Sequence, residues 1–236
     1  MSPTSSAALR LFEQIGDNQH AGEVHSHLGH VFGPFSPHLD VRRGLMHLDQ
    51  AETLLREMSE EHSLGLLYWG LAMTDLEAMR VSEALAASQK AMDIFARLGE
   101  REFWARAACN HSQHLMVKGK LARATGLIDE MAGTTAAFVN PDAFQHVSLW
   151  CGWFWMQMRD PRDAMRCYQL GLKRPGRDLK LRGRLLEYLT FCEALVGNLT
   201  EAKRLAAENY LNPTYSMQMP ILTVTGMEPR KRLRRP

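Results

Sequence analysis

Residues 151–171 read CGWFWMQMRDPRDAMRCYQLG, and this stretch contains the pattern that decides the fold. An apolar segment is followed by the turn signal Asp160-Pro161-Arg162 and then by Ala164, Tyr168 and Gly171. Spacings of four and seven residues place these three side chains on one stripe of a helix. Because small residues in such a stripe let a neighbouring helix approach closely, the stretch predicts two helices joined by a tight turn.

The same pattern recurs along the chain with a nearly constant period. The first residues of the five stripes, at 44, 84, 124, 164 and 202, are 40, 40, 40 and 38 residues apart. The other stripes are Gly44-Leu48-Ala51, Ala84-Ser88-Ala91, Ala124-Ile128-Met131 and Ala202-Ala206-Asn209. An apolar helical segment precedes each stripe, at 21–32, 62–76, 103–117, 143–158 and 181–196, and turns such as Lys118-Gly119-Lys120 and Gly197-Asn198 separate the two helices. We therefore predict an all-α fold, an α-solenoid of stacked antiparallel helical hairpins.

The period also predicts the organisation of the chain. Residues 8–17 align with residues 91–100, sharing Ala, Phe and Gly at matching positions, so residues 1–20 are expected to hold the trailing helix of an incomplete repeat. Five hairpins of about 40 residues are expected over 21–211. A chain that begins within a repeat fits either a truncated cap or a fragment of a longer protein; we favour the fragment, because a cap should show a polar outer face.

Composition agrees with a helical protein and excludes several classes. Leucine, alanine and methionine greatly outnumber valine and isoleucine, which favours helix over sheet. The longest apolar run, 147–158, is too short to span a bilayer, and the first residues lack the pattern of a secretory signal. Cys109, Cys151, Cys167 and Cys192 form no CxxC pair, so we expect a reducing, cytoplasmic location.

The last segment, 212–236, differs from the rest of the chain. Four Pro and Gly positions interrupt any helix, at Pro213, Pro220, Gly226 and Pro229, and a basic run follows. The formal net charge is +2, and five positive charges lie within the last seven residues, so the rest of the chain carries a net −3. We expect an irregular basic tail that binds nothing specifically, and no specific nucleic-acid partner for the folded body.

Histidines are the first candidates for a metal or catalytic site. Six of the ten lie early in the chain, at His20, His25, His27, His30, His38 and His47. Only His27 and His30 share a helix face, and no carboxylate or cysteine at ligand spacing completes the set. His111 and His114 lack an HExxH pattern. We expect solvated or groove-lining histidines and no metal or cofactor; metal-dependent catalysis by the early group is the alternative, and would require bound zinc or iron.

Cysteine catalysis is not indicated either. The four cysteines fall inside predicted helices, where small thiols are common core residues, and no Cys-His motif accompanies them. No GxxxxGK[ST] phosphate loop or other catalytic signature occurs. The sequence therefore predicts no catalytic residue, and the protein is not expected to be an enzyme.

Three of these units resemble the tetratricopeptide repeat (TPR). The resemblance lies in Cys151-Gly152, Trp155, the turn to Ala164 and then Tyr168, and in the turn-to-alanine phrases 119–124 and 197–202. The chain departs from the short consensus in its period of about 40 rather than ~34 residues and in an inserted loop at 33–38. Long units of this kind resemble the helical arrays attached to bacterial signal-transduction ATPases, LuxR/MalT-type regulators and nucleotide-cyclase fusions.

The resemblance implies that the first helices of successive hairpins line a concave surface. Carrying over its register predicts a binding groove formed by Leu67, Leu71, Cys109, Gln113, Met116, Leu149, Trp153, Met156, Glu187 and Phe191. Trp153 and Phe191 would act as rigid apolar anchors, with Gln113 and Glu187 as polar neighbours. The predicted function is a scaffold or regulatory module that binds a peptide, a partner protein or an adjoining domain. The alternative is a small-molecule-sensing segment of a bacterial regulator or of a cyclase or ATPase fusion.

Overall fold

The computed structural model describes residues 3–33, 39–58 and 60–210, and every regular element in these ranges is helical. The first helices of the five hairpins are α2 (Asn18–Val31), α4 (Glu61–Glu77), α6 (Arg101–Val117), α8 (Pro141–Gln157) and α10 (Leu179–Leu195). The second helices are α3 (Val41–Met58), α5 (Val81–Leu98), α7 (Leu121–Thr134), α9 (Pro161–Leu172) and α11 (Leu199–Tyr210). Helix α1 (Pro3–Ile15) precedes them, and a short 3-10 helix, η1 (Thr135–Ala137), follows α7. The predicted tail, 212–236, lies outside the described residues.

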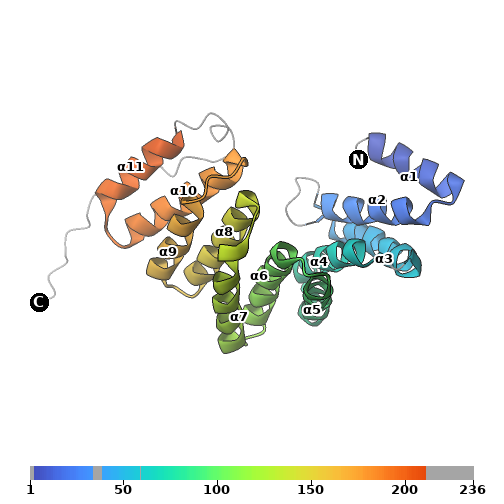
Figure 1. Cartoon of the computed structure of the whole chain (residues 1–236), viewed down its shortest axis with the longest axis horizontal. Helices are drawn as coiled ribbons and strands as arrows, with labels where there is room; N and C mark the ends of the chain where they lie inside the picture. The colour runs from blue at the N-terminus through green and yellow to red at the C-terminus, as the bar shows by residue number, and fades with distance from the viewer. Residues whose placement is uncertain (1–2, 34–38, 59, 211–236) are drawn as a thin grey trace, which may run out of the picture.

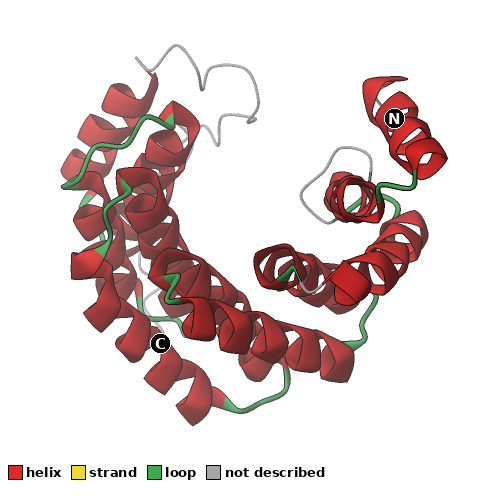
Figure 2. Cartoon of the chain, turned by 45° about the vertical axis from the view of Figure 1, so that its right-hand side comes forward, coloured by secondary structure: helices red, strands yellow, loops and turns green. Residues whose placement is uncertain are grey.

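The helices pack on their neighbours in sequence order and form an arch (Figure 1). Each first helix also packs on the first helix of the next hairpin, from α2 through α4, α6 and α8 to α10. Figure 2 shows the same curvature from a second direction, with the two ends of the arch on either side of an open centre. The predicted all-α array of hairpins is confirmed, and the first helices lie on its inner side.

The predicted small-residue stripes form the contacts within the hairpins. All members of the first four stripes are buried, and Leu48, Ala84, Ala124 and Ala164 are each 0% exposed. The fifth stripe differs from the prediction, because Ala206 is exposed and Leu205 is buried in its place. Helix α11 is the last helix that the structure describes, so no later described hairpin covers its Ala206 side.

Glycines on the first helices allow the closest approaches. A Cβ atom at Gly152 would lie 2.2 Å from Cε1 of Tyr168, and one at Gly22 would lie 2.9 Å from Cγ of Leu55. Tyr168 and Leu55 are both 0% exposed, so neither side chain has room to withdraw. The two helices of these hairpins therefore touch through a small residue on one and a large residue on the other.

The turns inside the hairpins use a left-handed residue at one repeated position. Gly119 and Gly197 have φ values of 77° and 88°, and the equivalent residues Met79 and Arg159 both have φ of 59°. Where the next helix begins with Pro161, the side chain of Asp160 accepts hydrogen bonds from the N–H groups of Arg162 and Asp163 and caps the helix. The predicted turn positions are thus the helix ends.

Replacing Met79 with glycine is expected to stabilise the protein. The Met79 side chain is 79% exposed, so it contributes little packing, whereas its Cβ atom disfavours the left-handed backbone that glycine adopts freely. We expect Met79→Gly to raise the free energy of unfolding by about 0.5–1 kcal/mol. Urea denaturation measures the change, and a loss of stability would contradict this account of the turn.

Candidate partner-binding surface

The ten predicted groove residues divide into two groups. Four are buried in the core, which makes their assignment to an open groove wrong: Leu67, Leu71, Cys109 and Leu149. Cys109 shows the reason, because its thiol points to the second helix of its own hairpin and lies 3.5 Å from Sδ of Met131. The other six are at least partly exposed, and their contact with a partner stays a prediction: Gln113, Met116, Trp153, Met156, Glu187 and Phe191.

On α6 and α8 the inner stripe begins three residues before the predicted one, which rotates it by about 60° around the helix axis. On α6 this stripe is Arg106, Asn110 and Gln113, with spacings of four and seven residues that place all three on one side. On α8 the equivalent residues, 40 positions later, are His146, Trp150 and Trp153. We identify this side as the inner face of the arch because its contacts with other helices are made only to first helices.

Arg106 is the central cation of the inner face. Its guanidinium carbon lies 4.5 Å from the centroid of the Trp69 ring on α4, in a cation–π arrangement. Burial lowers the pKa of Arg106, which means that the charged form has lost part of its hydration. The carboxylate of Glu102 is the nearby opposite charge, and its Oε1 accepts hydrogen bonds from the backbone N–H groups of Val139 and Asn140, at 3.0 and 2.9 Å.

Four buried N–H donors of the inner face have no hydrogen-bond acceptor among the described residues. They are Trp69 Nε1, Arg106 Nε, Asn110 Nδ2 and Gln113 Nε2. Asn110 is only 5% exposed, so water does not replace the missing partner freely. An unsatisfied buried polar group costs about 1–3 kcal/mol, so an acceptor brought to these N–H groups would be stabilising.

His146 adds a fifth donor on α8. Its Nε2 accepts a hydrogen bond of 2.8 Å from Nε1 of Trp150. Burial, with the charges of Arg106 and Arg184 as smaller causes, lowers the pKa of His146 to about 3, so the ring is neutral at pH 7. A neutral ring that accepts at Nε2 carries its proton on Nδ1, so the second ring nitrogen is a donor.

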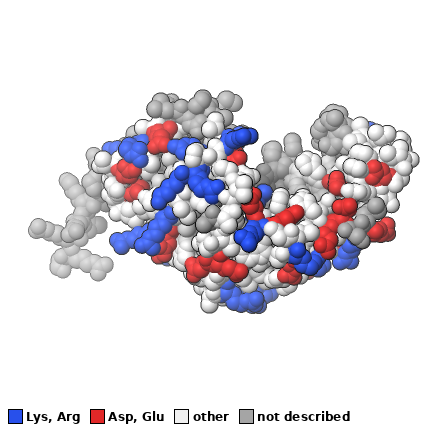
Figure 3. Space-filling model, viewed as in Figure 1, with Lys and Arg blue, Asp and Glu red and all other residues white. Residues whose placement is uncertain are grey.

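The same surface continues toward the amino-terminal end. The His30 ring on α2 lies over Gly70, where a Cβ atom would be 2.6 Å from its Cε1, and its centroid is 6.0 Å from that of Trp69. At the other end the Trp150 and Trp153 rings meet edge to face at 5.8 Å. The inner face is therefore a continuous row of aromatic and donor groups from α2 to α8. Figure 3 shows basic side chains gathered over the α8 to α10 part of one face.

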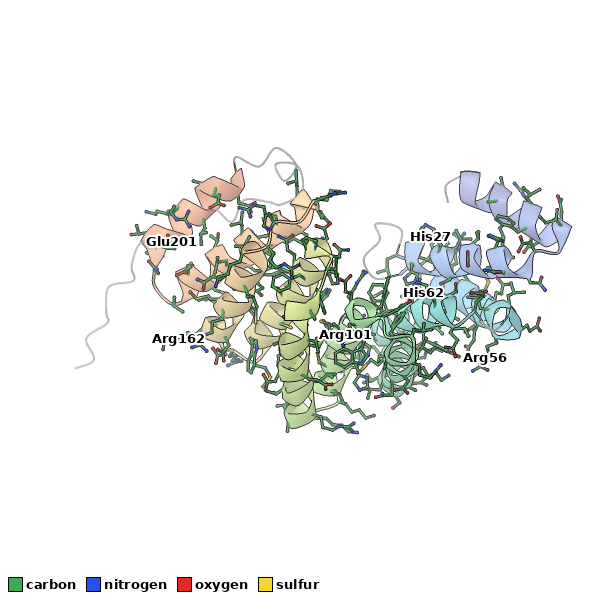
Figure 4. The ribbon with its side chains drawn as sticks, viewed as in Figure 1. His27, Arg56, His62, Arg101, Arg162 and Glu201 are labelled. Atoms are coloured by element: carbon green, nitrogen blue, oxygen red, sulfur yellow. The ribbon has the colours of Figure 1, made fainter. Side chains whose placement is uncertain are left out.

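Of the early histidines, two form a buried pair rather than a metal site. His25 on α2 and His47 on α3 are 5% and 7% exposed, with their Nδ1 atoms 2.9 Å apart. His20 and His27 are exposed, and Figure 4 shows His27 on α2. His38 lies outside the described residues. Within the described ranges, no group of three or more His, Cys, Asp or Glu side chains is arranged to hold a metal ion.

A serine and two histidines meet between α5 and α6. Ser88 Oγ lies 2.8 Å from Nδ1 of His111 and 3.2 Å from Nδ1 of His114. Such a contact occurs in hydrolases, but Ser88 is 0% exposed and its hydroxyl donates to the Ala84 carbonyl at 2.8 Å. This group joins two hairpins and offers no access to a substrate.

The cysteines are poor nucleophiles in this structure. All four are free thiols, and Cys109, Cys151 and Cys192 are buried. Burial raises the pKa of Cys167 to about 12 and that of Cys192 to about 11, so the reactive thiolate is disfavoured at neutral pH.

Two shallow depressions lie away from the inner face. One, of about 450 Å³, is lined by α3 residues only: Asp49, Glu52, Thr53, Arg56 and Glu57. The other, of about 400 Å³, lies between α9 and the end of α10. Both are open and mostly polar, unlike the enclosed apolar pockets that hold small ligands. No described helix is both long and apolar enough to cross a membrane.

Comparison with known proteins adds no assignment. No protein-family model matches this chain, and no curated protein matches it either. Any functional assignment therefore depends on the chemistry of the inner face.

Proposed function

We propose that this protein is an interaction module whose inner face binds an acidic, extended peptide segment of a partner protein. The observation that carries the proposal is the group of unpaired donors on three partly exposed side chains, Arg106, Trp69 and Gln113. A surface that presents a cation and several unpaired N–H donors is complementary to carboxylates and backbone carbonyls.

The energetics favour an anionic ligand. A carboxylate beside Arg106 would restore a counter-charge to a partly desolvated guanidinium, and its second oxygen could accept from one of the neighbouring N–H groups. A basic ligand would place like charges beside Arg106 and Arg184, so the arrangement also disfavours the binding of a positively charged peptide. The basic tail of this chain, 230–235, is excluded as the occupant by the same argument.

The extent of the surface favours a peptide over a small metabolite. The row from His30 on α2 to Trp153 on α8 crosses four first helices, and Phe191 on α10 is 49% exposed beyond it. Large aromatic anchors beside a charged centre are typical of protein interfaces. We keep the TPR-like assignment, a role within a larger bacterial regulator and a cytoplasmic location as parts of this proposal; the four free cysteines support a reducing compartment.

A charge comparison tests the proposed function. Dye-labelled peptides of equal length, one rich in glutamate and one rich in lysine, are titrated with the protein in fluorescence anisotropy. We expect saturable binding of the acidic peptide only. Arg106→Met should weaken this binding about 10- to 100-fold, the value of one charge-assisted hydrogen bond.

Arg162→Met is the matched control. Arg162 is exposed on α9 and lies on the outer side of the arch in Figure 4, so its loss should leave the affinity unchanged. Equal weakening by both substitutions would reduce the effect to general charge and contradict the assigned site. Preference for the lysine-rich peptide, or saturable binding of metabolites without any peptide binding, would overturn the proposal.

A further inference from the structure

A second group of cations lies at the start of α10, two first helices away from Arg106. Arg184 has the place on α10 that Arg106 has on α6 and His146 has on α8, because each lies 18 residues before the first residue of a small-residue stripe. Helix α8 packs on both α6 and α10, so these three positions follow one another along the arch. The charges of both arginines contribute to the lowered pKa of His146, which agrees with this order.

The cations at the start of α10 are not used by the fold. Arg177, Lys180 and Arg184 are all exposed, and among the described residues none of their side chains forms an ion pair or a hydrogen bond. Arg182 differs from them, because its guanidinium pairs with Glu208 on α11 at 3.0 Å. The first three cations are therefore available to a ligand, whereas Arg182 joins the two helices of its hairpin.

These charges repel one another in the absence of an anion. Lys180 and Arg184 lie four residues apart on the same side of α10, a spacing at which like charges destabilise a helix. The only acidic residue among residues 173–186 is Asp178, and its carboxylate accepts hydrogen bonds from the backbone N–H groups of Lys180 and Leu181, at 2.9 and 3.1 Å. An anionic group of a ligand beside Arg184 would offset the repulsion.

We infer that Arg184 and Lys180 form a second acidic subsite, so that the bound segment carries two acidic positions about five or six residues apart. This inference rests on the proposed function, in which the first acidic position pairs with Arg106. Packed helices lie about 8–10 Å apart, so α6 and α10, which are two steps apart, are separated by about 16–20 Å. An extended segment advances about 3.3 Å per residue and covers this distance in about five or six residues.

The surface between the two cations favours an acidic peptide over a nucleic acid. A nucleic-acid backbone carries a negative charge at every nucleotide and would need a cation at each step. Here the intervening helix α8 presents the neutral His146 ring and the Trp150 indole, whose Nε1 donates to His146 at 2.8 Å. An order of cation, neutral ring and cation instead fits separated acidic side chains on a peptide.

A spacing series of peptides tests the second subsite. Dye-labelled Gly/Ser peptides of equal length carry either one glutamate pair or two pairs at spacings of about two, six or ten residues, and each is titrated with the full chain in fluorescence anisotropy. We expect the peptide with the spacing of about six residues to bind about five- to tenfold more tightly than the one-pair peptide and than the other two-pair peptides. The two-pair peptides have equal charge, so the comparison isolates geometry.

Substitutions then assign the gain to α10. Arg184→Met should reduce the affinity ratio between the best two-pair peptide and the one-pair peptide to about one, and Arg184→Lys should keep a large part of it. Lys203→Met is the control, because it removes an exposed charge from α11 of the same hairpin and should leave the ratio unchanged.

The same titrations separate failure of the subsite from failure of the proposed function. An equal gain at every spacing, or a gain that persists in Arg184→Met, would overturn the second subsite. Binding of the one-pair peptide through Arg106 without any gain would overturn the subsite alone. If no acidic peptide binds, the proposed function fails as well. Tighter binding of a single-stranded oligonucleotide of similar length would also overturn the inference, because the cations would then fit a phosphate backbone.

Discussion

Acidification from pH 7.5 to pH 5 is expected to destabilise the protein strongly, because it folds around neutral histidines. Burial lowers the pKa of His114 to about 4 and that of His146 to about 3, and it also lowers the pKa of His25, His30 and His47. The unfolded chain takes up protons below pH 6.5, whereas these buried rings do not. Their contribution is therefore complete above pH 6.5 and is lost as the pH falls toward the folded values.

His114 alone gives a measurable share of this loss. It is 1% exposed, and a change of pKa from 6.5 to about 4 corresponds to about 2 kcal/mol of unfolding free energy lost by pH 5. Urea denaturation at pH 7.5 and pH 5 measures the difference. His114→Gln should lower stability at pH 7.5, since it removes the contact with Ser88, but should reduce the difference between the two pH values by about that amount.

Met79→Gly is the control for the acid experiment. It removes no titratable group and lies in an exposed turn, so it should leave the pH dependence unchanged. An equal pH dependence in the wild type and in His114→Gln would contradict the assignment of a buried neutral ring at this position.

Gly152→Ala is expected to cost about 3 kcal/mol of unfolding free energy. The added Cβ atom would lie 2.2 Å from Cε1 and 2.6 Å from Cδ1 of Tyr168, a fully buried ring. Either α8 and α9 must move apart or the ring must leave its rotamer, and overpacking of this kind typically costs 1–3 kcal/mol, occasionally more. Urea or thermal denaturation measures the loss.

The repeat itself supplies the rescue and the control. Forty residues earlier, Ser112 and Ile128 occupy the positions of Gly152 and Tyr168, so Gly152→Ala combined with Tyr168→Ile should recover a large part of the loss. Gly126→Ala, on the exposed side of α7 with no atom within 4 Å of the added Cβ, should stabilise the protein by about 0.5–1 kcal/mol. Additive losses in the double variant would contradict the proposed contact between positions 152 and 168.

The hairpins could be predicted from the sequence because each second helix has one narrow buried stripe. The stripe of small residues that includes Ala84 and Ala124 fixes where the second helix packs, and Gly119 or Asp160 fixes where it starts. The predicted first helices agree with the observed ones to within three residues at each end. The fifth stripe is less regular: the pattern predicts that Ala206 is buried, but its side chain is exposed.

The inner face could not be derived in the same way. A first helix packs on its own second helix, on the preceding one and on neighbouring first helices, so apolar residues occur on several sides of α6 and α8. The register of the TPR predicts Cys109 and Leu149 in the groove, but both side chains are buried. The sequence does contain a polar signal for the inner face. An arginine or histidine recurs 18 residues before the first residue of a stripe, at Arg106, His146 and Arg184.

The five tryptophan indoles provide the most direct test of the inner face. Each gives one N–H signal in a ¹H–¹⁵N spectrum, assigned by single Trp→Phe substitutions. On titration with the glutamate-rich peptide, the Trp69 signal should shift with the binding curve, because its Nε1–H gains an acceptor. Trp155, which packs against both core clusters, should not shift. An unchanged Trp69 signal at peptide saturation would contradict the central claim that unpaired donors on the inner face receive an acidic partner.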